Sequence, residues 1–185
     1  HVIQGAEGIF VFYPGKAGGA FIKQYAQAGL QGKIPLYSVF TVDSIALPKL
    51  QKANMNGVMG SVMTQFWAPD LDTPQNKKFV SGFKRKYGRY PSFYAAQSYD
   101  TMFLIKSAVE AVKGDLSNKD GMRAAMEKAN FPSVRGKFSY GNNHFPIQNF
   151  YSREVVKDSD GVWTTSVREV VLKNHQDTYA KDCSM

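Results

Sequence analysis

Hydrophobic residues alternate between two spacings in the first third of the chain. Continuous apolar runs at residues 9–13, 35–40 and 57–66 predict buried strands. Between them, apolar residues at helical spacing predict one helix that ends at Gly29 and a weaker, proline-containing helix over 44–53. This strand–helix alternation predicts a parallel sheet with right-handed crossovers, and therefore an α/β fold class.

The pattern changes in the remaining two thirds. Residues 67–76 hold two prolines, two aspartates and an asparagine, which is typical of a linker or crossing segment. A helix around 79–87 follows, then a long helix over 92–112 whose wide apolar arc predicts deep burial. A short amphipathic helix precedes a hairpin that we expect to turn at residues 159–161.

The composition predicts a packed core, and the start of the chain suggests that an upstream part is missing. The chain has 185 residues, 43% of them hydrophobic, and no apolar run approaches the ~20 residues of a membrane helix. It starts at His1, almost directly before a buried strand, which suggests a processed or truncated product. The lone Cys183 is either an inert tail thiol or a partner for a cysteine upstream, and both interpretations stay open.

The chain is basic, with 23 lysines and arginines against 15 acidic residues and a net charge of +8. Such a charge can attract nucleic acid, acidic membranes or anionic solutes. The densest cluster, at 84–86, ends a predicted helix, where cations suit the helix dipole. No nucleic-acid motif accompanies the charge, so nucleic acid is not an expected partner.

Motif spacing argues against nucleotide binding and catalysis. In residues 10–21 the Gly15-Lys16 pair is followed by alanine instead of serine or threonine, and no two glycines lie two apart. The three histidines lack metal-ligand spacing, and GxSxG is absent. Asp100, inside the long helix, is expected to make a structural hydrogen bond or ion pair. No cofactor, metal or catalytic set is therefore predicted, and an enzyme is disfavoured.

The turns after the three predicted strands are the candidate site. In open α/β sheets, ligands bind at the carboxyl ends of the strands. Aromatic walls, hydroxyls, free N–H groups at a helix start and one lysine suit a small solute with an apolar body and an anionic group. The alternative, that the aromatic residues only fill the hydrophobic core, stays open. The candidates are Tyr13, Pro14, Gly15 and Lys16, then Phe40, Thr41, Val42 and Asp43, then Gln65, Phe66 and Trp67.

Two specific blocks carry a family resemblance, YGxxPSxYAAQxYD at 87–100 and RGxFxxxxNHxPIQxFYxREV at 135–155. With the segment FVFYPGKAGGAFIKQYAQAGLQGKIPLYSVFTVD at 10–43, they resemble type I periplasmic solute-binding proteins of ABC importers. The branch is the one named for leucine, isoleucine and valine. Within it, the sequence is most similar to members that bind aromatic carboxylates.

The resemblance implies two Rossmann-like parallel-sheet lobes joined by three crossovers, of which this chain matches about the C-terminal half. Residues 1–66 would be a lobe-two α/β segment, 67–147 the crossover and lobe-one helices, and 148–185 a hairpin returning to lobe two. The missing half would carry most of lobe one. The chain alone would leave faces uncovered that expose apolar patches. It would therefore need the missing half, a partner copy or a rearranged packing.

The resemblance also implies the function. Solute contacts fall on the turns Tyr13–Ala17 and Phe40–Asp43, and lobe closure captures a small organic anion in the periplasm. An aromatic carboxylate is expected first and a branched-chain amino acid next, delivered to an ABC permease without a cofactor. The alternatives are a ligand-sensing receptor domain of the same fold and an α/β enzyme using Asp43 or Asp100 as a base.

Overall fold

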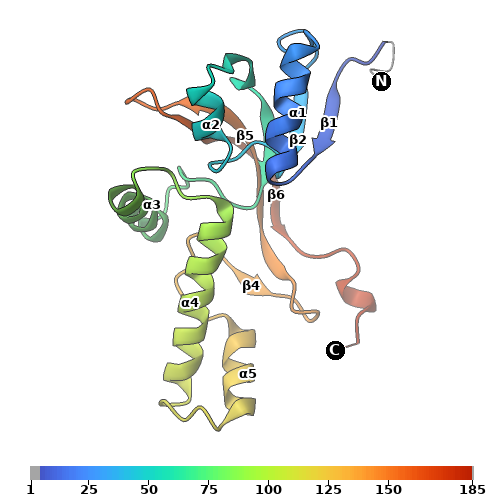
Figure 1. Ribbon diagram of the computed structural model, residues 1–185. Coiled ribbons are helices and arrows are strands. Elements are labelled where there is room, and N and C mark those ends of the chain that lie inside the picture. The colour runs from blue at the N-terminus through green and yellow to red at the C-terminus, as the bar shows by residue number, and fades with distance from the viewer. Residues whose placement is uncertain (1–4, 185) are drawn as a thin grey trace.

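A computed structural model describes residues 5–184. It shows one mixed sheet of six strands with helices packed beside it (Figure 1). The strands are β1 (Ile9–Phe12), β2 (Leu36–Val39), β3 (Val62–Gln65), β4 (Ser139–Tyr140), β5 (Pro146–Lys157) and β6 (Trp163–His175). The helices are α1 (Lys16–Gln27), α2 (Leu47–Lys52), α3 (Pro74–Tyr87), α4 (Phe93–Ala111) and α5 (Lys119–Lys128), with 3-10 turns at Asn56–Val58 and Ala180–Asp182.

The first three strands are parallel, as the sequence predicts. β1 pairs with β2, with Ile9 opposite Leu36, and β2 pairs with β3, with Tyr37 opposite Val62. The predicted hairpin is also confirmed, because β5 and β6 pair antiparallel and turn at residues 158–161. β5 then adds antiparallel to β3, which makes the sheet mixed.

The predicted strand at 57–66 is wrong over its first half. Residues 56–58 form a 3-10 turn, and Gly60 has a φ of 74°, a left-handed conformation that glycine adopts without strain. The Gly60 N–H donates to the Val155 carbonyl of β5, so the turn is attached to the sheet before β3 begins. The observed strand is therefore limited to Val62–Gln65.

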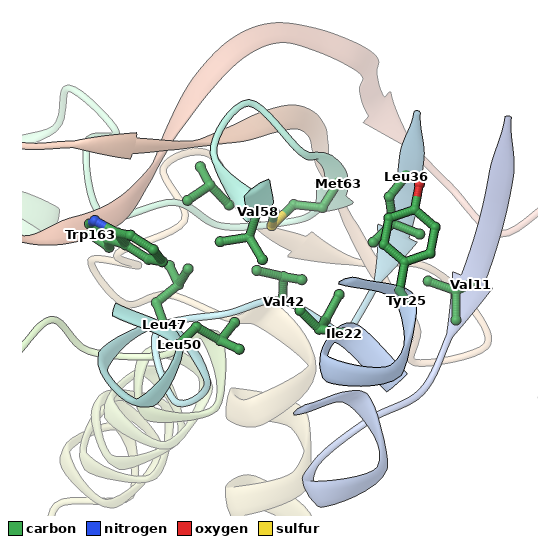
Figure 2. Packing of buried hydrophobic residues seen from close by; sticks show 11 residues of the cluster. Val11, Ile22, Tyr25, Leu36, Val42, Leu47, Leu50, Val58, Met63 and Trp163 are labelled. Atoms are coloured by element: carbon green, nitrogen blue, oxygen red, sulfur yellow. The ribbon is translucent and has the colours of Figure 1, made fainter. Parts of the chain in front are cut away.

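A first core lies where α1 and α2 cover one face of the sheet (Figure 2). Ile22 of α1, Leu47 of α2, Met63 of β3 and Trp163 of β6 are all buried in it. Burying each such side chain contributes ~1.5–3 kcal/mol relative to exposure. Gln51 fastens the hairpin to α2, because its Oε1 accepts from the Trp163 N–H at 2.9 Å.

A second core lies between α3, α4 and the segment that follows β3. Trp67 is 0% exposed, and its Nε1 donates to Asn76 Oδ1 at 2.8 Å. The Asn76 amide donates to the carbonyls of Ala68, Pro69 and Leu71, so the predicted linker is a fixed crossing segment. Thr73 caps α3 by accepting from the Asn76 N–H at 3.2 Å.

Asp100 and Arg135 form a buried ion pair, with Arg135 Nε at 2.9 Å from Asp100 Oδ2. Asp100 also accepts from the Ser133 hydroxyl and the Val134 N–H, and Arg135 Nη1 donates to Gln148 at 3.0 Å. The structural role expected for Asp100 is thus confirmed. The network joins α4 to the loop after α5 and to the start of β5.

A second link joins the α3–α4 region to the tip of the hairpin. The Tyr90 hydroxyl donates to Asp158 Oδ2 at 2.8 Å, and Lys84 Nζ lies 3.6 Å from the same oxygen. Burial acts to raise the pKa of Asp158. Hydrogen bonds from Tyr90 and from the Val162 and Asp160 N–H groups outweigh it and hold that pKa below its ordinary value of 3.8.

The deep burial predicted for the long helix is wrong. α4 buries only Phe93, Ala96, Asp100 and Ala108, and Met102 is 65% exposed. On the sheet, Phe10 of β1 is 71% exposed. The apolar arc of α4 is present in the sequence, but within residues 5–184 no element is packed over Met102 or Phe10.

Replacing Asp100 by alanine should lower the free energy of unfolding by about 3–5 kcal/mol, because it leaves Arg135 buried without its counter-charge. Urea unfolding followed by circular dichroism measures the change. Asp120→Ala is the matched control, since Asp120 pairs with Arg123 on the surface and should contribute under about 1 kcal/mol. Equal midpoints for the two variants would contradict the network's role.

Asp158→Asn should remove stability at neutral pH but not in acid. A carboxyl whose folded pKa lies below 3.8 stabilises the protein above that pH, and the contribution is lost as the pH falls through the folded value. The stability difference between the unmutated chain and Asp158→Asn should therefore shrink from pH 6 to pH 2.5. Asp160→Asn, on the same turn, is the control for the loss of one surface carboxylate.

Candidate functional site

A cavity of about 520 Å³ lies at the carboxyl ends of β1 and β2. It brings together four of the predicted residues, Gly15, Lys16, Thr41 and Asp43. Other hollows lie between α3 and α4, at about 590 Å³, and between α3 and the hairpin, at about 440 Å³. Of these three hollows, the first lies at the edge where open α/β sheets bind ligands, so this cavity is the candidate site.

Thr41 joins the two turns that border the cavity. Its Oγ1 accepts from the Tyr13 N–H at 2.9 Å and lies 3.1 Å from the Val39 carbonyl. The turn after β1 is thereby fixed to the turn after β2. Thr41 is buried, so the bond is shielded from water on the side of its acceptor.

Gly18 permits α1 to approach both turns. A Cβ at Gly18 would collide with the Tyr13 carbonyl and would lie 2.9 Å from the Thr41 carbonyl. At Gly19, in contrast, a Cβ would meet nothing within 4 Å. The close contact of helix and turns therefore needs glycine at one position of the Gly-Gly pair and not at the other.

Asp43 shapes the second turn and the start of α2. Its Oδ1 accepts from the N–H groups of Ile45 at 2.8 Å and Ala46 at 3.0 Å. These bonds hold the carboxylate at the wall of the cavity. They also pair the Ile45 N–H before the helix, whereas the Ala46 N–H reaches the Asp43 carbonyl as well, at 3.1 Å.

Phe40 has a φ of 57°, a left-handed conformation that is unusual for an aromatic residue. Its ring packs edge-on against Phe12 at 5.8 Å and Phe93 at 4.8 Å, and Phe93 in turn packs against Phe66 at 6.0 Å. The strained backbone, of order 1–3 kcal/mol, is thus held by aromatic contacts from β1 and α4. Strain of this kind clusters at ligand-binding and switch positions.

The other predicted residues lie outside the lining of the cavity. Tyr13 is exposed, as are its neighbours Pro14 and Ala17, and its ring packs against Phe21 at 5.6 Å. Gln65 is buried and accepts from the Phe66 N–H. Trp67 belongs to the second core. Contact of any of these residues with a solute remains a prediction.

Sequence reasoning missed several residues that line the cavity. Lys23 lies seven residues after Lys16 on the same face of α1, a helical spacing that could have indicated it. Lys49, on α2, gives a third cation. Tyr94 comes from α4, whose approach to this edge no local pattern predicts. The remaining lining is apolar, with Leu50 and Met55 among it, so three lysines and one carboxylate surround an apolar interior.

The chain is similar to proteins of one family. The family model described as periplasmic binding protein matches residues 3–161. A Leu/Ile/Val-binding protein homolog from Brucella abortus is 32% identical over 167 residues, which cover 86% of this chain and 41% of that protein. The chain therefore spans less than half the length of the relatives it matches.

Solved structures agree with this similarity. A solute-binding protein of an ABC transporter from R. palustris, in complex with benzoate, is 31% identical with a TM-score of 0.78, covering 93% of this chain and 45% of that one. One from Rhodopseudomonas palustris HaA2, in complex with p-hydroxybenzoic acid, is 30% identical with a TM-score of 0.79, covering 94% and 47%. A leucine-binding protein from Thermotoga maritima, at 21% identity and TM-score 0.67 over 89% of this chain and 44% of that one, shares the fold.

The described part of the chain lacks two features. Across residues 5–184, no helix has the length and apolar character that a membrane span requires. The same residues contain no group of three or more His, Cys, Asp or Glu side chains arranged to hold a metal ion.

Gly18→Ala should lower the free energy of unfolding by roughly 1–3 kcal/mol, because the added methyl group forces α1 away from the two turns. Gly19→Ala, one residue further along the helix, should keep or raise stability, since alanine is a better helix former by up to ~1 kcal/mol. Thermal unfolding of the two variants checks the pair. The same midpoint for both would show that the turns are not tightly packed against α1.

Proposed function

Because this chain belongs to the periplasmic binding protein family, we propose that it forms part of the extracytoplasmic solute-binding component of an ABC transporter. The component captures a small organic anion between two lobes and delivers it to a membrane permease. It works in the periplasm, and it makes or breaks no bond in the solute.

The cavity at the strand ends carries this proposal. Its volume of about 520 Å³ lies within the range of ~300–1,000 Å³ typical of small-molecule sites. Lys16, Lys23 and Lys49 exceed the single carboxylate of Asp43, so the lining favours a negative solute. Its apolar interior accommodates a solute with an apolar body.

An aromatic carboxylate is the preferred solute, ahead of a branched-chain amino acid. The two relatives that carry benzoate and p-hydroxybenzoic acid are 30–31% identical to this chain, whereas the leucine-binding protein is 21% identical. The cavity agrees with that choice, because an aromatic acid offers a single charge of the sign that three lysines attract.

The mechanism is capture by closure of two lobes about the crossing segments. We infer that residues 1–66 and 148–185 belong to one lobe and that 67–147 form the crossover and part of the other. Tyr94, from the second group, lines the same cavity as the turns of the first. A solute that touches both parts favours the closed form by its difference in affinity for the closed and open forms.

The exposed apolar faces fit a partner that completes the two lobes. Phe10, Phe12 and Tyr37 on the sheet, and Met102 on α4, are large exposed apolar side chains. Soluble monomers seldom leave such faces open. We infer that they contact the N-terminal half of the same protein, which would also supply the rest of the solute site.

A ligand screen of the complete gene product tests the function. Benzoate, p-hydroxybenzoate and related acids should raise the melting temperature, because binding adds ~2.7 kcal/mol at a hundredfold excess over the dissociation constant. Leucine, isoleucine and valine should give smaller shifts or none. The absence of a shift with every compound of both classes would contradict the proposed function.

A further inference from the structure

Arg153 is a buried cation that the solute contacts described above do not use. It lies on β5, opposite Met63 of β3, and its side chain is 4% exposed. Nη1 donates to Thr165 Oγ1 at 3.1 Å, whereas Nε is buried without a hydrogen-bond partner. Among the described residues no carboxylate lies within ion-pair distance, in contrast to the directly paired Arg135. A buried, unpaired guanidinium is unfavourable, so it calls for an explanation.

Two aspartates lie close enough to act on Arg153 through space. Burial lowers the pKa of the Arg153 guanidinium to about 10, and the charges of Asp43 and Asp70 act in the opposite direction. Arg153 therefore stays positive at neutral pH. Asp70, in the crossing segment, already accepts from the Ser166 hydroxyl and the Val167 N–H. Asp43 is the aspartate that lines the cavity.

The packing places Arg153 behind the wall that carries Asp43. Val42 and Val155 belong to the same buried cluster (Val42 is labelled in Figure 2). Val42 is next to Asp43, and Val155 is two residues after Arg153. Met63, the residue opposite Arg153 on β3, belongs to this cluster as well, so the turn after β2 and this part of β5 border the same core. The hydrogen bonds of the Asp43 carboxylate within the described residues come from backbone N–H groups, which leave its full charge at the cavity wall.

We propose that Arg153 is a specificity-determining residue of the solute site, whose buried positive charge offsets that of Asp43 and so lets an anionic solute occupy the cavity. This inference rests on the proposed function. Without Arg153, the charge of Asp43 would repel an acid and cancel part of the attraction from Lys16, Lys23 and Lys49. A neutral solute of the same shape would not be affected.

The test uses the complete gene product and two probes of one shape, benzoate and its uncharged analogue benzamide. Arg153→Met should weaken benzoate binding by about tenfold or more and leave benzamide binding nearly unchanged. Asp43→Asn in the Arg153→Met background should restore benzoate binding to within a few-fold, since asparagine keeps the Oδ1 acceptor and removes the charge. Arg153→Lys should behave like the unmutated protein. Isothermal titration calorimetry at low salt measures all of these affinities.

The outcomes separate this inference from the function on which it rests. Unchanged benzoate binding in Arg153→Met would overturn it, and so would an equal loss for both probes that Asp43→Asn does not restore. If Arg153→Met does not fold, the Asp43→Asn variant alone decides. Tighter benzoate binding with unchanged benzamide binding would support the inference. Unchanged benzoate binding would refute it. An unmutated protein that binds neither benzoate nor any other acid of the screen would refute the proposed function, and this inference with it.

Discussion

The antiparallel pairing of β5 with β3 is the contact on which the rest of the structure depends. It brings residues 151–154 beside 62–65, at the strand end from which the chain crosses to α3. The same strand also pairs with β4 and β6 and carries Gln148, which holds Arg135. Because one strand makes all of these contacts, the βαβ segment, the helices and the hairpin share a common frame.

Buried charges are handled in two ways on that frame. Asp100 and Arg135 meet directly, and every oxygen of the carboxylate has a donor, so the pair fixes α4 against the loop after α5. Arg153 has one hydrogen bond and no direct counter-charge within the described residues, so its field reaches the turn of Asp43. A satisfied pair suits a structural role, whereas a buried charge that acts on a carboxylate of the cavity lining suits control over what the cavity accepts.

Local patterns were sufficient for most elements of the fold. The apolar runs located β1 and β2, the helical spacing located α1 and α4, and the turn residues located the hairpin, because these signals depend on neighbours in sequence. They were misleading at 57–66, where Gly60 and its bond to Val155 precede a strand that starts only at Val62. They also overestimated the burial of α4, since an apolar arc states what a helix can bury but not whether anything covers it.

For the site, the sequence by itself determined the edge and the two turns, because strand-to-helix turns collect at the carboxyl ends of a parallel sheet. Gly15, Lys16, Thr41 and Asp43, which were predicted in this way, line the candidate cavity. Only the tertiary structure decided that Trp67 is core and that Tyr94 lines the cavity. It alone placed Arg153 behind Asp43, since these positions depend on how segments distant in sequence pack together, which no local spacing encodes.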